Sequence, residues 1–467
     1  MQVEARADGW FIEGGRMPGI DPGQVPAFRA RGAWAQRTLG DIIAQSAAIW
    51  PNRIALVVEG RRVSYRELDA MSSRLALGFL ENGIGPGDMV AVQLPNGIAH
   101  AAVVYALGKI GAVCNLIVPI MRAKEVSFIL NHCRSKALVV PGEYGKFDYL
   151  RMAEEVAGGA PALRTIFVAG NDVRERDGVV ALGRLMEGPR GDHAGDRLAS
   201  LRPSPDAPSL VGFTSGTTAQ PKAYVHTHNT EYANAWNCML ADGYNELARP
   251  GVSIALPGFA WMYGRWCGLF ASTLAGVTNI IVDPFTPEAV MAAIAAENPT
   301  HLHGAPAIYR SLLDGLRTLP PIGESPLSVF HYAGSTMPWE MGRQLRAHAH
   351  VLTCYGLSEI SPVCGTTIHD DAETQIRSSG RAWPGNEVWI GDENSRPLGV
   401  EEEGEIHVRG PGLTLGYLRQ EAANDSAFPE PGLFRTGDLG YMDATGRLHI
   451  TGRSKDVIDR GGIKFSP

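Results

Sequence analysis

A short run of hydroxyl residues and glycine is the segment most able to do chemistry. It consists of Thr214, Ser215, Gly216, Thr217 and Thr218, and it is followed by Pro221 and Lys222. Such a run presents several backbone N–H groups and hydroxyl donors in one turn, which can wrap phosphate oxygens, and the lysine adds a point charge. The spacing is not that of a Walker loop. The run therefore predicts a phosphate-binding loop in which Lys222 offsets negative charge.

The residues around this loop support the prediction of a phosphate site. Apolar runs precede and follow it, so we expect a tight turn between two strands. No acidic residue lies between Thr214 and Lys222, as suits an anion site. A plain surface loop contains the same small residues, and the loop chemistry alone leaves that alternative open.

Length and composition limit the possible classes of protein. A chain of 467 residues is too long for one ordinary core, so two or three subdomains are expected. The 45% hydrophobic and 19% charged fractions are those of a globular protein. The formal charge of −7 argues against a nucleic-acid partner. No apolar stretch reaches the length of a membrane span, and the first thirty residues carry charges. We therefore expect a cytoplasmic protein with no signal peptide and no membrane partner.

The elements that must position the loop follow an alternating pattern. Residues 54–64 predict a hairpin, and a capping box of Ser64 and Glu67 predicts the start of a helix. The strand-like run Met89–Leu94 and the helical run His100–Gly111 continue the alternation. Alternating strands and helices predict mostly parallel sheets flanked by helices, so the expected fold class is α/β.

Changes in composition and in the hydrophobic pattern mark the expected subdomain boundaries. Gly188–Pro208 is rich in Gly, Pro, Asp and Arg and is expected to be a solvated connection. A second alternating stretch runs from Ser209 to about Ile368. From Asn386 onward, short runs separated by turns predict a small antiparallel β subdomain.

Residues 214–222 resemble the signature loop of the AMP-forming adenylating enzymes. This family includes acyl- and aryl-CoA ligases, peptide-synthetase adenylation domains and firefly luciferase. Its loop ends in Gly-x-Pro-Lys-Gly, whereas Ala219 and Ala223 stand at the two glycine positions here. Both alanines are small, so we expect the loop to close with less backbone freedom. The resemblance implies ATP binding, two αβ-layered subdomains with mostly parallel sheets and a small β-barrel-like subdomain.

Further motifs resemble those of the family in the same order along the chain. His331–Thr336 is similar to the adenine-binding turn, which implies that Gly334 and Ser335 contact the nucleotide. Gly334 would let the base approach the backbone.

A second motif, Tyr355–Glu359, resembles the Tyr-Gly-x-Thr-Glu motif of the family. The resemblance implies that Tyr355 stacks on the adenine beside Gly356, and that Ser358 faces the α-phosphate. It also implies that Glu359 holds Mg²⁺, an ion that suits a single carboxylate with phosphate oxygens.

The last motifs resemble the ribose site and the hinge of the family. Arg435–Asp438 implies that Asp438 binds the ribose hydroxyls, and Gly452–Asp456 implies that Arg453 contacts the ribose and that Lys455 is the hinge pivot. Each residue alone also has an ordinary structural interpretation, and it is their joint order that favours the resemblance.

The segment Leu256–Gly264 resembles the part of the family that lies beside the acyl group. Trp261 stands at the position that packs against the substrate, and a core tryptophan is the alternative. The expected acid pocket comprises Trp261, Tyr263, Gly264, Gly304, Ala333 and Gly334. No charged partner for an amino acid is evident, so a bulky apolar acid, aromatic or alicyclic, is expected. The entry stretch Phe28–Trp34 also resembles aryl-acid and alicyclic-acid ligases.

The resemblance implies a reaction in two halves. The acid carboxylate attacks the α-phosphorus of ATP, an acyl-adenylate forms and pyrophosphate leaves, while Lys222, the loop hydroxyls and Mg²⁺ on Glu359 stabilise the charge. His228 is a candidate beside the carboxylate, with a structural role as the alternative. Coenzyme A is the expected acceptor in an enzyme of secondary metabolism. The alternatives are transfer to an amine or carrier protein and a non-catalytic sensor of acyl-adenylates.

The resemblance also implies a division of the chain. Residues 1–452 correspond to the adenylation domain and residues 453–467 to the hinge and the start of a C-terminal lid domain, most of which we expect to be truncated here. We therefore expect binding of ATP, acid or adenylate with slow turnover. The sequence does not predict an oligomeric state.

Overall fold

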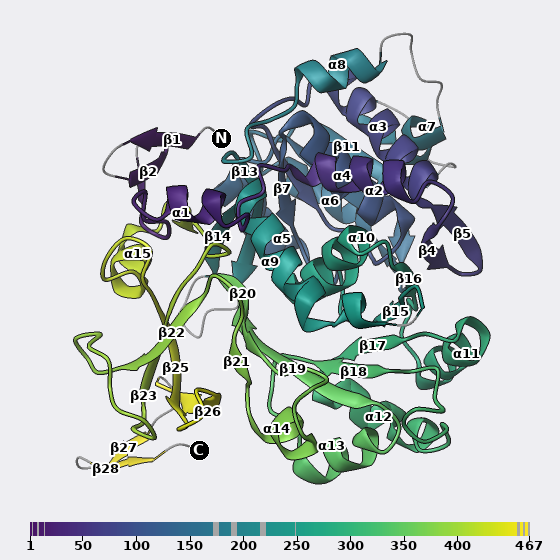
Figure 1. Ribbon diagram of the computed structural model, residues 1–467. Helices are drawn as coiled ribbons and strands as arrows, with labels where there is room; N and C mark the ends of the chain where they lie inside the picture. The colour runs from purple at the N-terminus through teal and green to yellow at the C-terminus, as the bar shows by residue number, and fades with distance from the viewer. Residues whose placement is uncertain are drawn as a thin grey trace.

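The computed structural model describes residues 1, 3–6, 9–13, 15–170, 177–187, 194–214, 221–247, 249–454, 458–460 and 463–465. Two large sheets flanked by helices lie beside each other, and a smaller sheet lies toward the C-terminus (Figure 1). This arrangement confirms the α/β class. In this part of the chain no helix is long and apolar enough to cross a membrane.

The first large sheet carries the candidate phosphate loop. Its eight strands follow the order β12-β11-β8-β6-β7-β13-β14-β24. The pairs from β12 to β13 are parallel, as the alternating sequence predicts, and the last two pairs are antiparallel. The bounds are β6 (Met89–Val92), β7 (Val113–Leu116), β8 (Ala137–Pro141), β11 (Thr165–Ala169), β12 (Val179–Ala181), β13 (Pro208–Thr214), β14 (Lys222–Thr227) and β24 (Gly416–Tyr417).

The second large sheet has nine strands in the order β21-β20-β19-β18-β17-β15-β16-β4-β5. Its strands from β4 to β19 are parallel, so their carboxyl ends meet at one edge, where ligands commonly bind in α/β proteins. The bounds are β4 (Ile54–Val58), β5 (Arg61–Ser64), β15 (Val252–Ala255), β16 (Thr278–Ile281), β17 (His301–Gly304), β18 (Val329–Tyr332), β19 (His350–Leu357), β20 (Ile360–Gly365) and β21 (Arg381–Ala382).

Helices cover both large sheets. The predicted capping box is confirmed, because the Ser64 side chain accepts from the Glu67 amide at the start of α3. The principal helices are α2 (Leu39–Ile49), α3 (Tyr65–Glu81), α4 (Ile98–Ile110), α5 (Ala123–Cys133), α6 (Tyr149–Ala157), α9 (His228–Ala241), η2 (Gly264–Ala271), α11 (Pro287–Glu297), α12 (Pro306–Leu316), α13 (Trp339–Arg346) and α14 (Ala372–Arg377).

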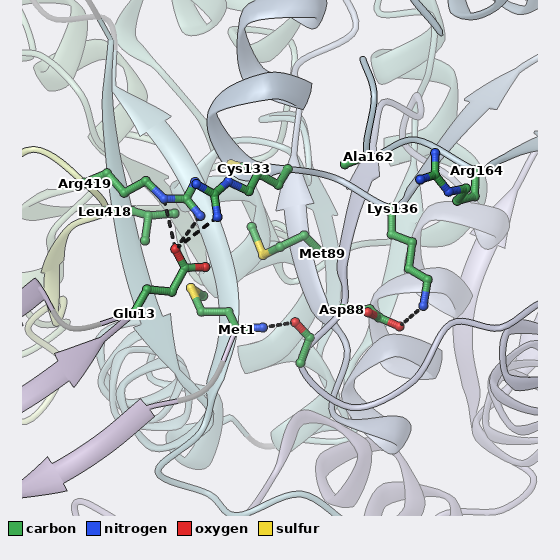
Figure 2. Close-up of a pocket in the computed structure, with 12 residues that line it drawn as sticks. Met1, Glu13, Asp88, Met89, Cys133, Lys136, Ala162, Arg164, Leu418 and Arg419 are labelled. Atoms are coloured by element: carbon green, nitrogen blue, oxygen red, sulfur yellow. Dashed lines mark hydrogen bonds and ion pairs between the residues drawn. The ribbon is translucent and has the colours of Figure 1, made fainter.

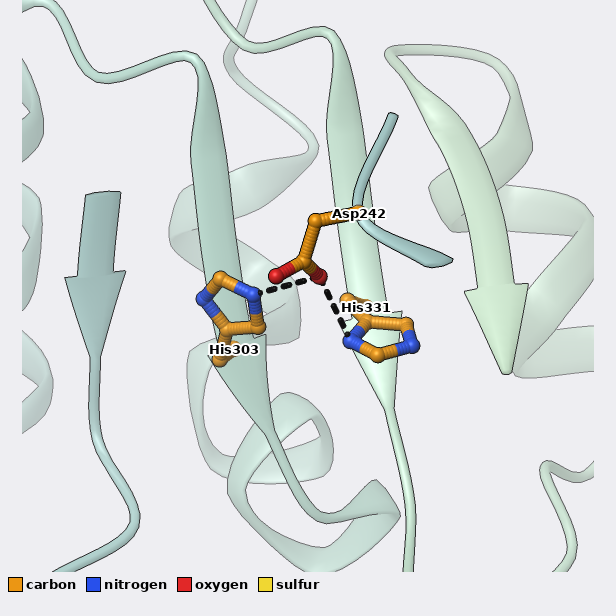
Figure 3. A group of neighbouring side chains, drawn as sticks. All are labelled: Asp242, His303 and His331. Atoms are coloured by element: carbon orange, nitrogen blue, oxygen red, sulfur yellow. Dashed lines mark hydrogen bonds and ion pairs between the residues drawn. The ribbon is translucent and has the colours of Figure 1, made fainter. Parts of the chain in front are cut away.

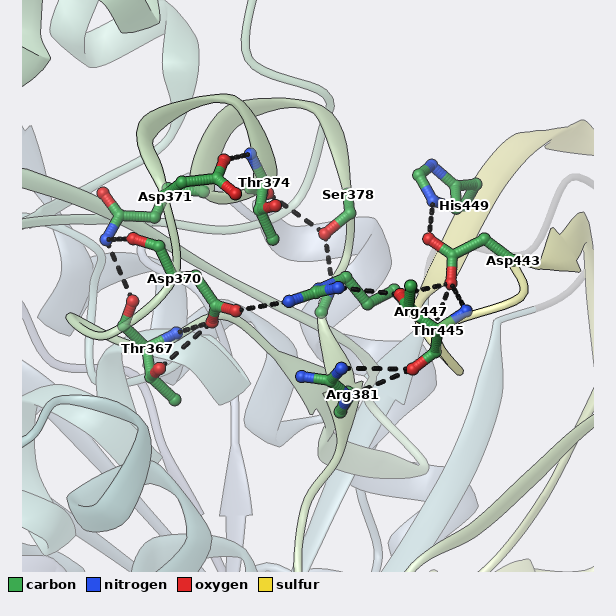
Figure 4. A network of polar contacts seen from close by, with 12 residues as sticks. Thr367, Asp370, Asp371, Thr374, Ser378, Arg381, Asp443, Thr445, Arg447 and His449 are labelled. Carbon is green, nitrogen blue, oxygen red and sulfur yellow. Dashed lines mark hydrogen bonds and ion pairs between the residues drawn. The ribbon is translucent and has the colours of Figure 1, made fainter.

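A third sheet, of four antiparallel strands, carries the C-terminal motifs. It runs β22 (Glu387–Gly391), β23 (Gly404–Arg409), β25 (Phe434–Met442) and β26 (Leu448–Arg453). A polar network joins the turn between β25 and β26 to the second large sheet (Figure 4). Arg447 Nη2 lies 3.0 Å from Asp370 Oδ1, and Arg381 Nη2 donates to the Thr445 carbonyl at 3.1 Å. The network fixes the third sheet against β21.

One expectation from the sequence differs from the structure. The third sheet is open, with β22 and β26 as its edges in the described residues, whereas we expected a barrel-like subdomain. The described part of Gly188–Pro208 is mostly exposed from residue 195 to residue 200, as expected of a solvated connection, and it contains the short helix α8 (Ala194–Ser200). Glycine and proline at the ends of that segment obscured this helix in the sequence.

An ion pair between helices α9 and η2 is completely buried. Arg265 Nε and Nη2 donate to Glu231 Oε2 and Oε1 at 3.2 and 3.3 Å, and Trp266 Nε1 donates to Glu231 Oε2 at 2.6 Å. All three side chains are 0% exposed. Removing one partner of such a pair leaves an uncompensated buried charge, which costs about 3–5 kcal/mol. The pair therefore holds α9 firmly against η2.

The first residue of η2 gives a test of this packing. A Cβ on Gly264 would lie 2.3 Å from the carbonyl oxygens of Pro257 and Gly258, which are backbone atoms. We expect Gly264→Ala to lower the free energy of unfolding in urea by about 1–3 kcal/mol. The control is Gly85→Ala, whose Cβ meets no atom within 4 Å, and it should change the free energy of unfolding by less than about 0.5 kcal/mol. Equal stability of the two variants would contradict the described packing.

Candidate active site

The candidate phosphate loop connects two antiparallel strands, as the sequence predicts. Thr214 ends β13 and pairs with Lys222 at the start of β14. The loop residues Ser215, Gly216, Thr217 and Thr218 lie outside the described residues, as does the hinge candidate Lys455. The structure therefore fixes the two ends of the loop, and the phosphate contacts remain a prediction.

Beside Lys222, a tyrosine that the sequence did not single out connects two candidate residues. Tyr417 donates its hydroxyl to Glu359 Oε1 at 2.7 Å, and Lys222 Nζ lies 4.7 Å from the centroid of the Tyr417 ring. Tyr417 reaches this place because β24 pairs with β14. No motif or spacing marks it in the sequence, because the three residues meet only through strand pairing.

The charged form of the buried Glu359 carboxyl is disfavoured. Burial raises its pKa, and the opposing effects of the Tyr417 hydroxyl and the Lys222 charge do not fully offset this. A divalent cation would supply the missing positive charge, and a buried carboxylate is a suitable oxygen ligand for Mg²⁺. The residues present therefore fit the predicted metal.

A second cluster joins the candidate nucleotide residues. The Tyr355 hydroxyl donates to Asp438 Oδ2 at 2.8 Å, and Arg453 Nε lies 3.0 Å from Asp438 Oδ1. Asp438 faces Arg453 across the pair β25–β26, while Tyr355 comes from β19 of the second large sheet. Burial raises the pKa of Asp438 despite the hydrogen bond from Tyr355 and the charge of Arg453. The structure thus brings together three residues that are far apart in the sequence.

The candidate adenine turn and the residues after Tyr355 are shaped by small side chains. Gly334 has φ +90° and no atom within 4 Å of an added Cβ, so the space beside it is open. Ser335 is exposed. A Cβ on Gly356 would lie 2.4 Å from Ser361 Oγ, which explains the need for glycine there. His226 Nε2 donates to the Ser358 carbonyl at 3.0 Å and supports this segment.

Two of the predicted acid-pocket residues, Trp261 and Tyr263, lie in the loop before η2, and Gly264 begins that helix. Trp261 is 54% exposed, which excludes the core alternative, and with Leu256, Gly258 and Phe285 it lines a cavity of about 130 Å³. Tyr263 donates its hydroxyl to the His331 carbonyl at 2.9 Å. Among the remaining candidates, Gly264 and Gly304 are buried and Ala333 is half-buried.

His228 occupies a structural position. Its Nδ1 accepts the Leu39 N–H at 3.2 Å, where α9 meets α2, and the side chain is 0% exposed. Burial lowers its pKa to about 3, so the ring is neutral. This placement favours the structural alternative, and we do not carry His228 into the proposed catalytic residues.

A separate cavity of about 360 Å³ lies beside the N-terminal residues (Figure 2). Both of its carboxylates are paired: Glu13 Oε2 lies 2.6 Å from Arg419 Nη2, and Asp88 Oδ2 lies 2.8 Å from Lys136 Nζ. Arg164 donates instead to the Pro161 carbonyl at 2.7 Å, and we assign no ligand to this cavity.

Comparison with known proteins matches most of the chain to enzymes that activate acids with ATP. A sequence model described as AMP-binding enzyme matches residues 43–418. The chain is similar to 2-hydroxy-7-methoxy-5-methyl-1-naphthoate–CoA ligase of Streptomyces carzinostaticus, with 32% identity over 453 residues that cover 95% of this chain and 80% of the relative. It is also similar to salicyl-AMP ligase/salicyl-S-ArCP synthetase of Mycobacterium tuberculosis, with 30% identity covering 96% and 80% of the two chains.

Solved structures show the same fold. The apo structure of Mycobacterium smegmatis MbtA matches with a TM-score of 0.82 and 28% identity, covering 96% of this chain and 82% of that one. The anthranilate CoA ligase AuaEII, in complex with anthranoyl-AMP, matches with a TM-score of 0.80 over 92% and 81% of the two chains. At 20% identity, the second match concerns the fold alone.

The raised pKa of the buried Glu359 carboxyl gives a second prediction. The raised pKa of Glu359 means that the folded protein binds this proton more tightly than the unfolded chain, so stability falls as pH rises through the two pKa values. We expect Glu359→Gln to raise the Tm of the ligand-free protein at pH 7 by about 1 °C or more, because the amide is neutral. Differential scanning calorimetry measures this change.

The matched control is Glu231→Gln, a second buried glutamate that has a full ionic partner in Arg265. We expect this variant to lose about 3–5 kcal/mol of stability, because it leaves the Arg265 charge buried alone. A loss of stability in both variants would contradict the difference in charge compensation between the two sites.

Proposed function

The chain belongs to the AMP-binding enzyme family, and on this premise we propose that it is an acid–thiol ligase that joins a bulky carboxylic acid to coenzyme A. The chain activates a carboxylic acid with ATP, forming an acyl-adenylate and releasing pyrophosphate. The acceptor, the acid and the roles of individual residues are the proposed parts. We further propose that residues 1–452 form the adenylation domain.

The observation that carries the proposal is the joining of Tyr355, Asp438 and Arg453 across two sheets. Burial raises the pKa of the Asp438 carboxyl although Tyr355 and Arg453 each contact one of its oxygens, and two vicinal ribose hydroxyls would add further donors. Tyr355 and Arg453 hold the carboxylate in place for this contact. We propose that Asp438 and Arg453 bind the ribose and that Tyr355 lies against the base beside Gly334.

Lys222 and Glu359 are the proposed charge-stabilising residues. Tyr417 holds the Glu359 carboxylate by its hydroxyl and supports Lys222 by its ring, so the two charges keep a fixed separation. The lysine offsets negative charge on the phosphate under attack, and the loop before it orients the phosphate oxygens. Magnesium, when bound at Glu359, would polarise the phosphate oxygens.

We propose the acceptor of the acyl group from the names of two relatives and from the chemistry of the second half-reaction. The naphthoate relative is named a CoA ligase, whereas the salicyl relative is named for transfer to a carrier protein. The acceptor in both chemistries is a thiol that attacks the adenylate carbonyl. Coenzyme A is our first choice, and a carrier protein is the alternative outcome of the test below.

The acid is proposed to be aromatic or alicyclic. Several relatives are named for aryl acids, among them naphthoate, salicylate and 2,3-dihydroxybenzoate. The cavity beside Trp261 has an apolar wall that includes Leu256 and Phe285, as suits a ring.

Acid-dependent exchange of labelled pyrophosphate into ATP tests the adenylation half. We expect exchange with at least one aryl acid, and we expect Asp438→Asn to raise the KM for ATP by about 10- to 100-fold, because it removes a charged hydrogen-bond acceptor. The control is Glu387→Gln, an exposed change on the same sheet, which should leave the KM unaltered. An unchanged KM in Asp438→Asn would contradict the proposed ribose site.

A second assay tests the acceptor. The acid that gives the fastest exchange is incubated with ATP and either coenzyme A or a phosphopantetheinylated carrier protein, and mass spectrometry identifies the product. We expect the acyl-CoA thioester. Acylation of the carrier protein without any acyl-CoA would overturn the choice of acceptor and leave the adenylation half in place.

A further inference from the structure

A glutamine that the proposed mechanism does not use reaches the end of the phosphate loop. Gln420 Nε2 donates to the Pro221 carbonyl at 3.1 Å, and Gln420 Oε1 accepts the Ala223 N–H at 2.8 Å. Pro221 and Ala223 are the two neighbours of Lys222, the residue that we propose stabilises charge on the phosphates. One side chain therefore holds the backbone on both sides of this lysine.

The two hydrogen bonds involve the two peptide groups that meet at Lys222. The Pro221 carbonyl belongs to the peptide group before the lysine, and the Ala223 N–H belongs to the one after it. Each peptide group is planar, so the orientations of the two planes set the φ and ψ angles of Lys222. These angles fix the direction in which the lysine side chain leaves the backbone. The Gln420 carboxamide therefore restricts where the ammonium group can lie.

The Gln420 side chain continues the strand pairing of β14 at the edge that faces β24. On the opposite edge, Lys222 pairs with Thr214 of β13. On the edge toward β24, the Leu418 N–H donates to the Ala223 carbonyl at 2.8 Å. The next donor and acceptor along this edge come from the Gln420 carboxamide instead of the backbone. The loop end is thus held from both edges of the strand.

Gln420 stands at the N-cap of helix α15 (Glu421–Ala427), which lies beside the end of β14 (Figure 1). An N-cap side chain is usually short and accepts an N–H from the first turn of its own helix. The Gln420 side chain makes no such bond, while its backbone carbonyl accepts the N–H groups of Ala423 and Asn424. The long carboxamide is therefore used on the phosphate loop rather than on its own helix.

A second carboxamide fixes the helix from which Gln420 extends. Asn424 Oδ1 accepts the Tyr417 N–H at 2.7 Å, and Asn424 Nδ2 donates to the Tyr417 carbonyl at 3.0 Å. Tyr417 in turn contacts Glu359 through its hydroxyl and Lys222 through its ring. The side chain and the backbone of Lys222 are thus held by the same short segment, through Tyr417 and Gln420 respectively.

We propose that Gln420 is a positioning residue for adenylation, whose carboxamide fixes the backbone around Lys222 and so directs the ammonium group at the phosphate under attack. The inference rests on the proposed function. A lysine stabilises the transition state only when its ammonium lies where charge develops, and a misplacement of about 1 Å can cost about 100-fold in rate. Because Gln420 contacts the backbone, it acts on the reaction through Lys222.

The alternative is that Gln420 only completes the hydrogen bonding of β14. Ala223 is 0% exposed, and a buried N–H needs a partner. A residue with that role alone would affect stability, and its effect on the rate would not depend on Lys222. The geometry favours positioning, because an acceptor alone would satisfy Ala223, whereas Gln420 also donates to the carbonyl on the other side of the lysine.

A double-mutant cycle tests whether Gln420 acts through Lys222. Gln420→Met keeps the length of the side chain and removes both hydrogen bonds, and Lys222→Met removes the ammonium group. In the pyrophosphate-exchange assay we expect kcat to fall by about 10-fold in Gln420→Met and by about 100-fold in Lys222→Met, with the KM for the acid within about twofold of the wild-type value. We expect the double variant to stay within about twofold of Lys222→Met, since an absent ammonium cannot be misplaced.

The matched control is Gln344→Met. Gln344 is a half-buried glutamine on α13 whose carboxamide contacts Arg317 and Glu340, and its variant should keep kcat within about twofold of the wild-type value. If Gln420→Met does not fold, Gln420→Glu enters the same cycle, because it keeps an acceptor for the Ala223 N–H and lacks the donor to the carbonyl.

Two results would overturn the inference while leaving adenylation in place. One is a wild-type kcat in either folded single variant. The other is a double variant about 10-fold slower than Lys222→Met, because independent effects on the rate multiply. Absence of exchange in the wild-type protein with every acid is a different result, and it would overturn the proposed function together with the inference.

Discussion

The buried ion pair between Glu231 and Arg265 is the constraint on which the site depends. Glu231 lies in the first turn of α9, which starts directly after β14, the strand that begins with Lys222. Arg265 lies in the first turn of η2, directly after the loop that carries Trp261 and Tyr263. Because neither charge can be left alone at 0% exposure, the two helices cannot slide apart. The pair therefore couples the position of the hairpin β13–β14 to the position of the loop that carries Trp261 and Tyr263, the two places where we propose that the phosphates and the acid bind.

Three buried carboxylates of the described residues differ in how their charge is compensated. Asp242 is compensated by two histidines and has a pKa well below its usual range, whereas Glu359 and Asp438 keep raised pKa values despite nearby cations. Burial raises the pKa values of Glu359 and Asp438, because it removes the water that would solvate their charged forms. We propose a cation at Glu359 and ribose hydroxyls at Asp438, and either ligand would offset this loss of solvation. If so, the two residues that lower the stability of the ligand-free protein are also those that gain most from binding.

The parts that the sequence predicted are those encoded locally. The hairpin of residues 54–64, the Ser64 cap and the strands on either side of the phosphate loop depend on neighbouring residues, and the structure confirms them. Tyr417 was missed because its contacts to Lys222 and Glu359 join three distant segments through strand pairing. The short helix α8 was missed because glycine and proline dominate its surroundings.

Two buried histidines show what the sequence could not assign. His303 and His331 meet Asp242 through strand pairing and the end of α9 (Figure 3), so no local pattern joins the three residues. A signal was present, since histidine is unusual among fully buried residues, and His303 and His331 each lie in a buried strand. The apolar acid stays a prediction, and the cavity wall beside Trp261 is the observation that favours it. An apolar wall distinguishes acids by size, at about 1–3 kcal/mol per methylene, so selection by this enzyme would rest on the width that Trp261, Leu256 and Phe285 leave for the acid.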